Sequence, residues 1–148
     1  MRSFERLQPL ALLLLRLGLG IIFIYHGYPK LFAGSHAQMH GFEQMGFPGY
    51  FVYVAGILEF FGGILLIAGL FTRIAGLLLA GEMAIAIWRV QLPMGPITAV
   101  KDYQFPLAMA IGAFALAAFG AGVLSFDHAI YGARARGGAG RSPRKPKS

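Results

Sequence analysis

The sequence contains no cysteine, and it has few charged residues for its length. Without a thiol, the chain itself can form no disulfide, thiolate metal site or iron–sulfur cluster, and it can carry out no thiol redox chemistry. Charged residues make up 13% of the 148 residues, whereas a soluble globular domain carries roughly 25%. The sequence also has no glycine-rich phosphate loop and no nucleotide fingerprint. Together these absences argue against a water-soluble enzyme.

The charge that is present is unevenly distributed along the chain. The net charge is +7, but six cations and no acid lie within residues 134–147, so residues 1–133 carry only +1. A basic end beside a nearly neutral apolar body is typical of the cytoplasmic flank of a membrane protein, and not of a groove for phosphates. We therefore predict no nucleic-acid partner, and a disordered basic cytoplasmic tail over residues 133–148.

Four apolar runs dominate the rest of the chain, which is 57% hydrophobic overall. Each run is near the length of about 20 residues that crosses a bilayer, and each is apolar on all sides. The first run is too long for a signal peptide and lacks a small-residue cleavage site, so we predict an uncleaved transmembrane helix. Lysine and arginine gather at one end, which places both termini in the cytoplasm. We predict an all-α, four-helix transmembrane bundle within residues 1–132, multi-pass in a bacterial inner (plasma) membrane, with spans at about 7–32, 51–70, 73–92 and 105–124.

Three charged residues, Arg16, Glu59 and Glu82, interrupt the predicted spans. Counted at about 1.5 Å per residue from the predicted cytoplasmic ends, they lie at about 14–16 Å depth. A lone charge there costs roughly 2.5–3.5 kcal/mol. We therefore predict a midplane polar cluster in which Arg16 bridges one or both glutamates, between helices that glycines allow to approach closely. The cluster would act either as polar glue for the bundle or in a functional role such as proton relay.

A second group of polar and aromatic side chains falls at the predicted outer boundary of the spans. Such side chains could hydrogen-bond the carbonyl oxygens of a quinone, and anchoring at the membrane interface is the alternative interpretation. The candidate ligand-binding residues are Tyr25, His26, Lys30, Trp88, Arg89 and Tyr103. His36, His40 and Glu43 recur at i, i+4 and i+7 in the loop predicted over residues 33–50. Because the glycines beside them disfavour a rigid helix, we predict no metal site.

Several short motifs, in their order and spacing, resemble the DoxX family of small four-helix membrane proteins over about residues 8–130. The motifs are Leu15-Arg16-Leu17, His26-Gly27 with Lys30-Leu31, Gly46-Phe47-Pro48, Leu58-Glu59 through Gly62-Gly63, Gly69-Leu70-Phe71-Thr72-Arg73, Glu82-Met83-Ala84 and Ser125-Phe126-Asp127. The chain departs from the family pattern at Ala121 and Val123, where proline and arginine are usual.

The resemblance implies an accessory subunit of a quinone-linked membrane oxidoreductase, or of a redox-stress complex that serves redox homeostasis. It implies no covalently bound cofactor, and the cofactor expected to bind without a covalent bond is quinone. The expected partners are the lipid bilayer and a soluble redox enzyme, with a homo-oligomer as a further option. The family supplies no catalytic residues to carry over, so it stays open whether the chain is itself an enzyme. A small-molecule permease and a non-catalytic membrane scaffold are the alternatives.

Overall fold

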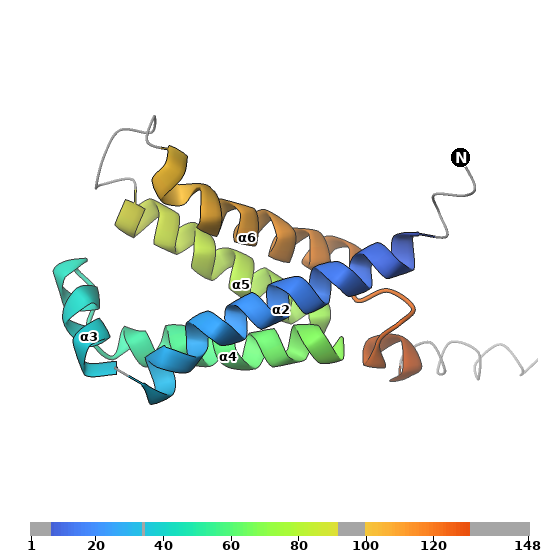
Figure 1. Ribbon diagram of the computed structural model, residues 1–148, viewed down its shortest axis with the longest axis horizontal. Helices are drawn as coiled ribbons and strands as arrows, with labels where there is room; N and C mark the ends of the chain where they lie inside the picture. The colour runs from blue at the N-terminus through green and yellow to red at the C-terminus, as the bar shows by residue number, and fades with distance from the viewer. Residues whose placement is uncertain (1–6, 34, 92–99, 131–148) are drawn as a thin grey trace, which may run out of the picture.

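A computed structural model describes residues 7–33, 35–91 and 100–130, and within these ranges it contains helices and turns but no strand (Figure 1). The prediction of an all-α chain is therefore confirmed. The predicted basic tail, residues 133–148, lies outside the described ranges. A short helical segment covers residues 126–130. The other helices, in chain order, are α2 (Gln8–Phe32), α3 (Ser35–Gln44), α4 (Phe51–Ala68), α5 (Thr72–Ala86), the π-helix η1 (Ile87–Gln91) and α6 (Val100–Phe119).

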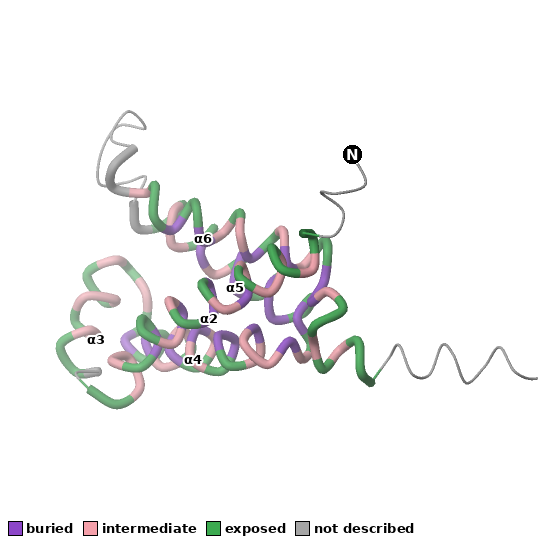
Figure 2. Tube along the Cα trace, turned by 45° about the vertical axis from the view of Figure 1, so that its right-hand side comes forward, coloured by how far each residue is buried: buried purple, intermediate pink, exposed green. Residues whose placement is uncertain are grey.

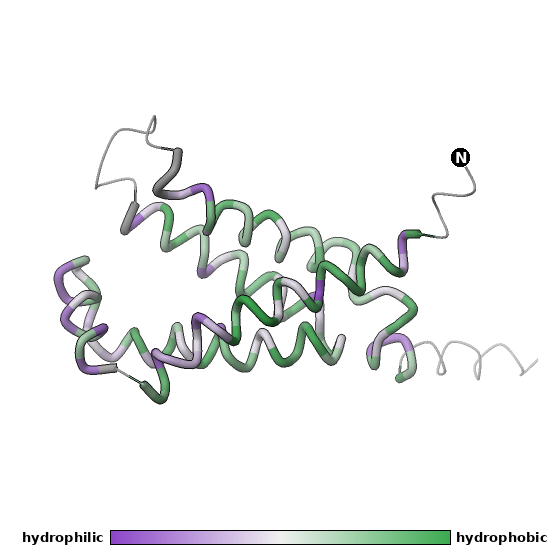
Figure 3. The backbone as a smooth tube through the Cα atoms, in the orientation of Figure 1, coloured by the Kyte–Doolittle hydropathy of each residue, from purple (hydrophilic) through white to green (hydrophobic). Residues whose placement is uncertain are grey.

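Two of the described helices, α2 and α4, are long and apolar enough to cross a membrane. α5 has 15 residues and continues directly into η1, and the apolar part of α6, Tyr103–Phe119, is shorter than a full span. Hydrophobic residues cover most of the long helices, whereas hydrophilic residues gather on α3 (Figure 3). The count of four spans and the cytoplasmic placement of both termini stay predictions.

α6 ends earlier than the span predicted over residues 105–124. It begins at Val100 and stops at Phe119. The next residues include Gly120 and Gly122, whose φ angles of +81° and +76° belong to the left-handed region. Because that backbone conformation favours glycine and cannot continue a right-handed helix, the chain turns back toward α4 at this point.

α2 and α4 run antiparallel and approach each other closely at two pairs of glycines. A Cβ atom at Gly63 would lie 2.6 Å from the carbonyl oxygen of Gly20. Seven residues later on α2 and seven residues earlier on α4, a Cβ atom at Gly27 would lie 2.9 Å from the carbonyl oxygen of Gly56. Small residues at one face allow helix backbones to approach in this way. The contact fixes the register of the two helices and determines which polar side chains meet.

The core lies where the long helices pack against one another, and the outward faces are apolar and exposed (Figure 2). Gly76 allows α5 to approach α6, since a Cβ atom there would lie 2.6 Å from the carbonyl oxygen of Ala113. Exposed apolar faces on every long helix are what a lipid-facing bundle presents. The buried core residues include Leu19, Phe23, Leu66, Leu79, Met109, Ala113 and Leu116.

The segment between α2 and α4 differs from the prediction, because residues 33–50 are not a plain loop. They contain the ten-residue helix α3, which includes Gly41 and ends before Gly46, whose φ is +80°. An internal glycine costs a helix only about 1 kcal/mol. Packing offsets this cost, because the ring of Phe42 lies 6.3 Å from that of Phe47. The glycines therefore bend the segment and end the helix without preventing it.

Candidate functional site

Arg16 is buried at the end of the bundle where α4 and α6 stop, with 2% of its surface exposed. Its guanidinium group donates four hydrogen bonds to backbone carbonyls, two in the last turn of α4 and two in the turn after α6, where carbonyls without helical partners are found. The acceptors are the carbonyls of Leu66 (3.0 Å), Ile67 (3.2 Å), Ala121 (2.6 Å) and Leu124 (2.8 Å). Arg16 therefore ties α2 to the end of α4 and to the turn after α6.

The predicted bridge from Arg16 to Glu59 or Glu82 is therefore wrong. A Cβ atom at Gly69 would lie 2.7 Å from Arg16 Cζ, so Arg16 is level with the C-terminal end of α4. Glu59 precedes Gly69 by ten residues, a rise of about 15 Å along a helix. The depth count assumed that the helices begin at one level, whereas the first turns of α2 extend beyond the end of α4 (Figure 1).

Glu59 has a different partner, Lys30, near the opposite end of α2. Lys30 Nζ lies 2.5 Å from Glu59 Oε2, and only 3% of Glu59 is exposed. The glycine contacts between α2 and α4 produce this ion pair, because a Cβ atom at Gly56 would lie 2.9 Å from Lys30 Cβ. A buried charge without a partner would be strongly destabilising. The sequence analysis assigned Lys30 to the outer ligand-binding group and missed its partner.

Glu82 shares a cavity with this ion pair. The cavity has a volume of about 440 Å³ and lies between α3, α4 and α5, and its polar lining residues are Lys30, Glu59 and Glu82. Glu82 Oε2 is buried and has no hydrogen-bond partner within the described residues. The structure thus brings Glu59 and Glu82 together as predicted, with Lys30 in the place proposed for Arg16. The remaining walls are apolar and include Phe42, Met45, Phe47, Phe51, Leu77 and Ile85.

Arg89 lies beside this cavity. Its Cζ atom is 5.6 Å from the ring centre of Phe47, which lines the cavity, and 5.6 Å from the ring centre of Trp88. Both contacts are in the range of cation–π interactions. Trp88 is 66% exposed, and it is the sole tryptophan of the chain. Two of the predicted ligand-binding residues therefore flank the cavity, and Lys30 lines it.

The other predicted ligand-binding residues lie elsewhere. The Tyr25 and His26 rings are 5.8 Å apart, and the His26 ring lies 5.3 Å from that of Phe105 on α6. Both residues line a shallow surface hollow along α2 and do not line the cavity that holds Glu82. Tyr103 is half-buried on α6. The structure therefore does not gather the six candidates into one site.

The metal prediction concerned His36, His40 and Glu43 on α3. His40 Nδ1 lies 3.4 Å from Glu43 Oε2, and both side chains are more than half exposed. Within the described residues, no group of three histidine or acidic side chains is placed to hold a metal ion. This result does not extend to the residues outside the described ranges.

Asp127 is a polar residue whose role the sequence analysis missed. Its Oδ1 accepts the backbone N–H of Phe71 (2.8 Å), and its Oδ2 accepts that of Thr72 (3.0 Å). Asp127 therefore caps the start of α5 from a distant part of the chain, and no side chain at the start of that helix does so. Its position in the motif Ser125-Phe126-Asp127 was the feature that could have pointed to it.

Several known proteins are similar in sequence to this chain. "Putative oxidoreductase CatD" of Bacillus subtilis (strain 168) is 33% identical over 136 residues, covering 92% of this chain and 96% of the relative. "Inner membrane protein YqjF" of Escherichia coli (strain K12) is 34% identical over 79 residues, covering 52% of this chain and 58% of the relative. No solved structure matches. The family model described as DoxX matches residues 11–92. Because this match covers more than half of the chain, and the Bacillus relative is similar over nearly the whole chain, the chain is a membrane protein of the DoxX family.

Proposed function

We propose that this protein is an accessory subunit of a quinone-linked oxidoreductase in the bacterial inner membrane, where it spans the bilayer several times. The observation that carries the proposal is the cavity between α3, α4 and α5, which is apolar except for Lys30, Glu59 and Glu82. Pockets for small organic ligands combine apolar walls with a few polar groups in this way. The printed name of the Bacillus relative supports a redox role.

The polar groups of the cavity suit both redox forms of a quinone. The ammonium group of Lys30 has three donors and pairs with Glu59 through one contact, so it has a donor for a ring carbonyl. Glu82 Oε2 has no partner within the described residues and can accept a hydrogen bond from a ring hydroxyl. A bound quinone would supply two-electron chemistry. Because the chain has no cysteine, we propose that the electrons come from a soluble redox enzyme.

The permease alternative has less support than the quinone proposal. That reading needs a polar path through the bundle, formed by the predicted midplane cluster that includes Arg16. The guanidinium of Arg16 is instead committed to four backbone carbonyls at the bundle end. The scaffold alternative predicts that the cavity binds no quinone, so the same experiment tests it.

Trp88 provides a direct assay, because it is the sole tryptophan and lies beside the cavity. Purified protein is titrated with decylubiquinone, and quenching of Trp88 emission is measured. Ala86→Phe should fill the cavity that Ala86 lines. The phenylalanine ring would occupy space that a quinone ring needs, so quinone should bind about tenfold more weakly or worse, a loss of about 1.4 kcal/mol or more.

Ala84→Phe is the matched control, because Ala84 is an exposed residue of the same helix and does not line the cavity. It should leave the titration unchanged. Equal quenching of the wild type and both variants would mean that quinone dissolved in the detergent causes the signal, and would leave the scaffold reading standing.

The accessory role is tested separately by purifying the tagged full chain from native membranes after mild cross-linking. We expect a co-purifying polypeptide that carries flavin, haem or iron–sulfur absorbance. Recovery of the chain alone, or only as a homo-oligomer, would contradict the accessory role without bearing on quinone binding.

A further inference from the structure

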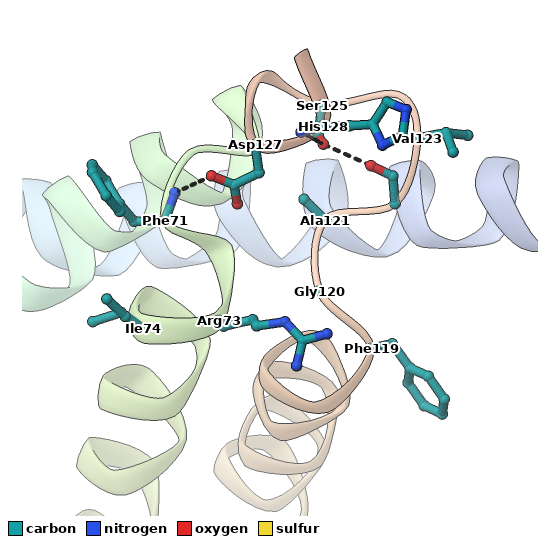
Figure 4. Close-up of a pocket in the computed structure, with 11 residues that line it drawn as sticks. Phe71, Arg73, Ile74, Phe119, Gly120, Ala121, Val123, Ser125, Asp127 and His128 are labelled. Atoms are coloured by element: carbon teal, nitrogen blue, oxygen red, sulfur yellow. Dashed lines mark hydrogen bonds between the residues drawn. The ribbon is translucent and has the colours of Figure 1, made fainter. Parts of the chain in front are cut away.

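A second cavity lies at the opposite end of the bundle from the Lys30–Glu59 pair, and the quinone proposal makes no use of it. It has a volume of about 610 Å³ and lies between the start of α5, the end of α6 and the turn at residues 120–128 (Figure 4). Arg73, Asp127 and His128 are its titratable lining residues. We refer to it as the inner cavity.

Arg73 supplies a positive charge to the inner cavity. Its side chain extends from α5 toward Gly120, and a Cβ atom at Gly120 would lie 3.2 Å from Arg73 Nε (Figure 4). Arg73 is exposed and forms no ion pair with any residue that the structure describes. A guanidinium in this state presents its N–H groups to a ligand.

The one acid of the inner cavity is committed elsewhere. Both carboxylate oxygens of Asp127 accept backbone N–H groups at the start of α5, from Phe71 and Thr72. The hydroxyl of Ser125 is also engaged, since it donates to the carbonyl of Gly122 (2.6 Å) and accepts the N–H of His128 (3.1 Å). The polar side-chain groups left for a ligand are therefore the guanidinium of Arg73 and the imidazole of His128. Both can donate N–H groups, which suits an anion.

Apolar side chains line much of the rest of the inner cavity. Those of Phe71, Ile74, Phe119 and Val123 all line the inner cavity and are about half exposed or more. Free inorganic phosphate would gain nothing from these side chains, whereas an acyl chain would bury them. Basic residues flank this end in the sequence, as expected on the side of a membrane that carries anionic lipid.

We propose that the inner cavity binds one anionic phospholipid, with its phosphate at Arg73 and an acyl chain along Ile74 and Phe119. The site does not depend on quinone binding, since it shares no residue with the cavity that holds Glu82. An anionic headgroup is preferred over a zwitterionic one, because the ammonium group of a zwitterion would be held near the positive charge of Arg73, and both oxygens of Asp127 already accept backbone N–H groups.

Native mass spectrometry of the detergent-purified full chain tests the site. Phosphatidylglycerol and phosphatidylethanolamine with identical acyl chains are added in parallel, and we expect about five-fold tighter binding of phosphatidylglycerol, the contribution of one cation near an anionic membrane surface. Arg73→Gln should remove most of this preference. Arg89→Gln, an arginine change near the other cavity, should keep it, and the basic tail is present in every variant.

Three results would overturn the proposal: no headgroup preference in the wild type, an unchanged preference in Arg73→Gln, or displacement of phosphatidylglycerol by millimolar inorganic phosphate. Phe119→Ala provides a second test if Arg73→Gln fails to fold. It should weaken phosphatidylglycerol binding several-fold, whereas Phe114→Ala, at an exposed residue of the same helix outside the cavity, should not. Equal binding by these two variants would exclude the acyl-chain contact.

Discussion

Replacing Arg16 with leucine should destabilise the whole bundle, because no other residue can take over its contacts. Among the four carbonyls that Arg16 bonds, that of Leu66 also accepts the N–H of Gly69 at 3.1 Å. Within the described residues, Arg16 is the one donor to the carbonyls of Ile67, Ala121 and Leu124. Arg16→Leu would leave these three carbonyls unpaired.

The size of the effect follows from the number of carbonyls left unpaired. A buried polar group without a partner costs about 1–3 kcal/mol. The bond to Ala121 is buried, whereas those to Ile67 and Leu124 are part-buried. Counting each part-buried carbonyl at about half the cost gives a loss of about 2–6 kcal/mol. The net stability of a folded domain is about 5–15 kcal/mol. At about 3 °C per kcal/mol for a chain of this size, the melting temperature should fall by roughly 5–20 °C. The melting temperature of Arg16→Lys should lie between those of the wild type and Arg16→Leu, since a single ammonium group cannot reach all four carbonyls.

The assay is thermal unfolding in detergent, followed by Trp88 emission and by recovery of monodisperse protein. Arg73→Leu is the control, because Arg73 lies at the same end of the bundle but is exposed. A surface substitution of that kind changes stability by about 0.5 kcal/mol or less. If Arg16→Leu melted within a few degrees of the wild type, the account of Arg16 as a donor that joins three segments would be refuted.

Three further changes test other parts of the structure by the same melting assay. Gly63→Ala should cost about 1–3 kcal/mol, because its Cβ would lie 2.6 Å from a backbone oxygen of α2, whereas Gly81→Ala, which meets nothing within 4 Å, should be neutral or stabilising; equal effects would contradict the close approach of α2 and α4. Lys30→Met should cost about 3–5 kcal/mol by leaving Glu59 buried without a partner, and adding Glu59→Met should recover most of that loss; a double variant no better than the single one would argue against the ion pair. Asp127→Ala should cost about 1–3 kcal/mol by removing the cap from α5, and an unchanged melting temperature would show that water serves equally well there.

Much of the fold follows from hydropathy and length. Apolar runs predicted the long helices, and the bounds of α2 and α4 agree closely with the predicted spans at 7–32 and 51–70. The errors in helix bounds fall in segments that contain glycine. Gly120 ended α6 early through its positive φ, whereas Gly41 did not prevent α3. Composition does not distinguish these cases, because the conformation of a glycine depends on what packs around it.

The candidate site was predictable in part. The cost of buried charge correctly indicated that Arg16 and Glu59 have partners, whereas Glu82 Oε2 has none within the described residues. The pairing failed because it depends on the offset of α2 against α4, which the glycine contacts set and which a count from the ends of the runs does not contain. Backbone carbonyls at helix ends were also overlooked as acceptors, although they are numerous wherever helices stop inside a membrane protein.

Arg16 and Asp127 differ from Glu82 in what their polar groups bond, and this difference separates stability from binding. Arg16 and Asp127, at one end of the bundle, direct their hydrogen-bonding groups at the backbone of other segments. Their loss breaks existing bonds and must destabilise the fold. In the cavity that holds Glu82, its Oε2 has no partner within the described residues, so a ligand there adds a hydrogen bond without breaking one. Because Glu82→Gln breaks no hydrogen bond at that oxygen, it should change ligand binding far more than it changes unfolding.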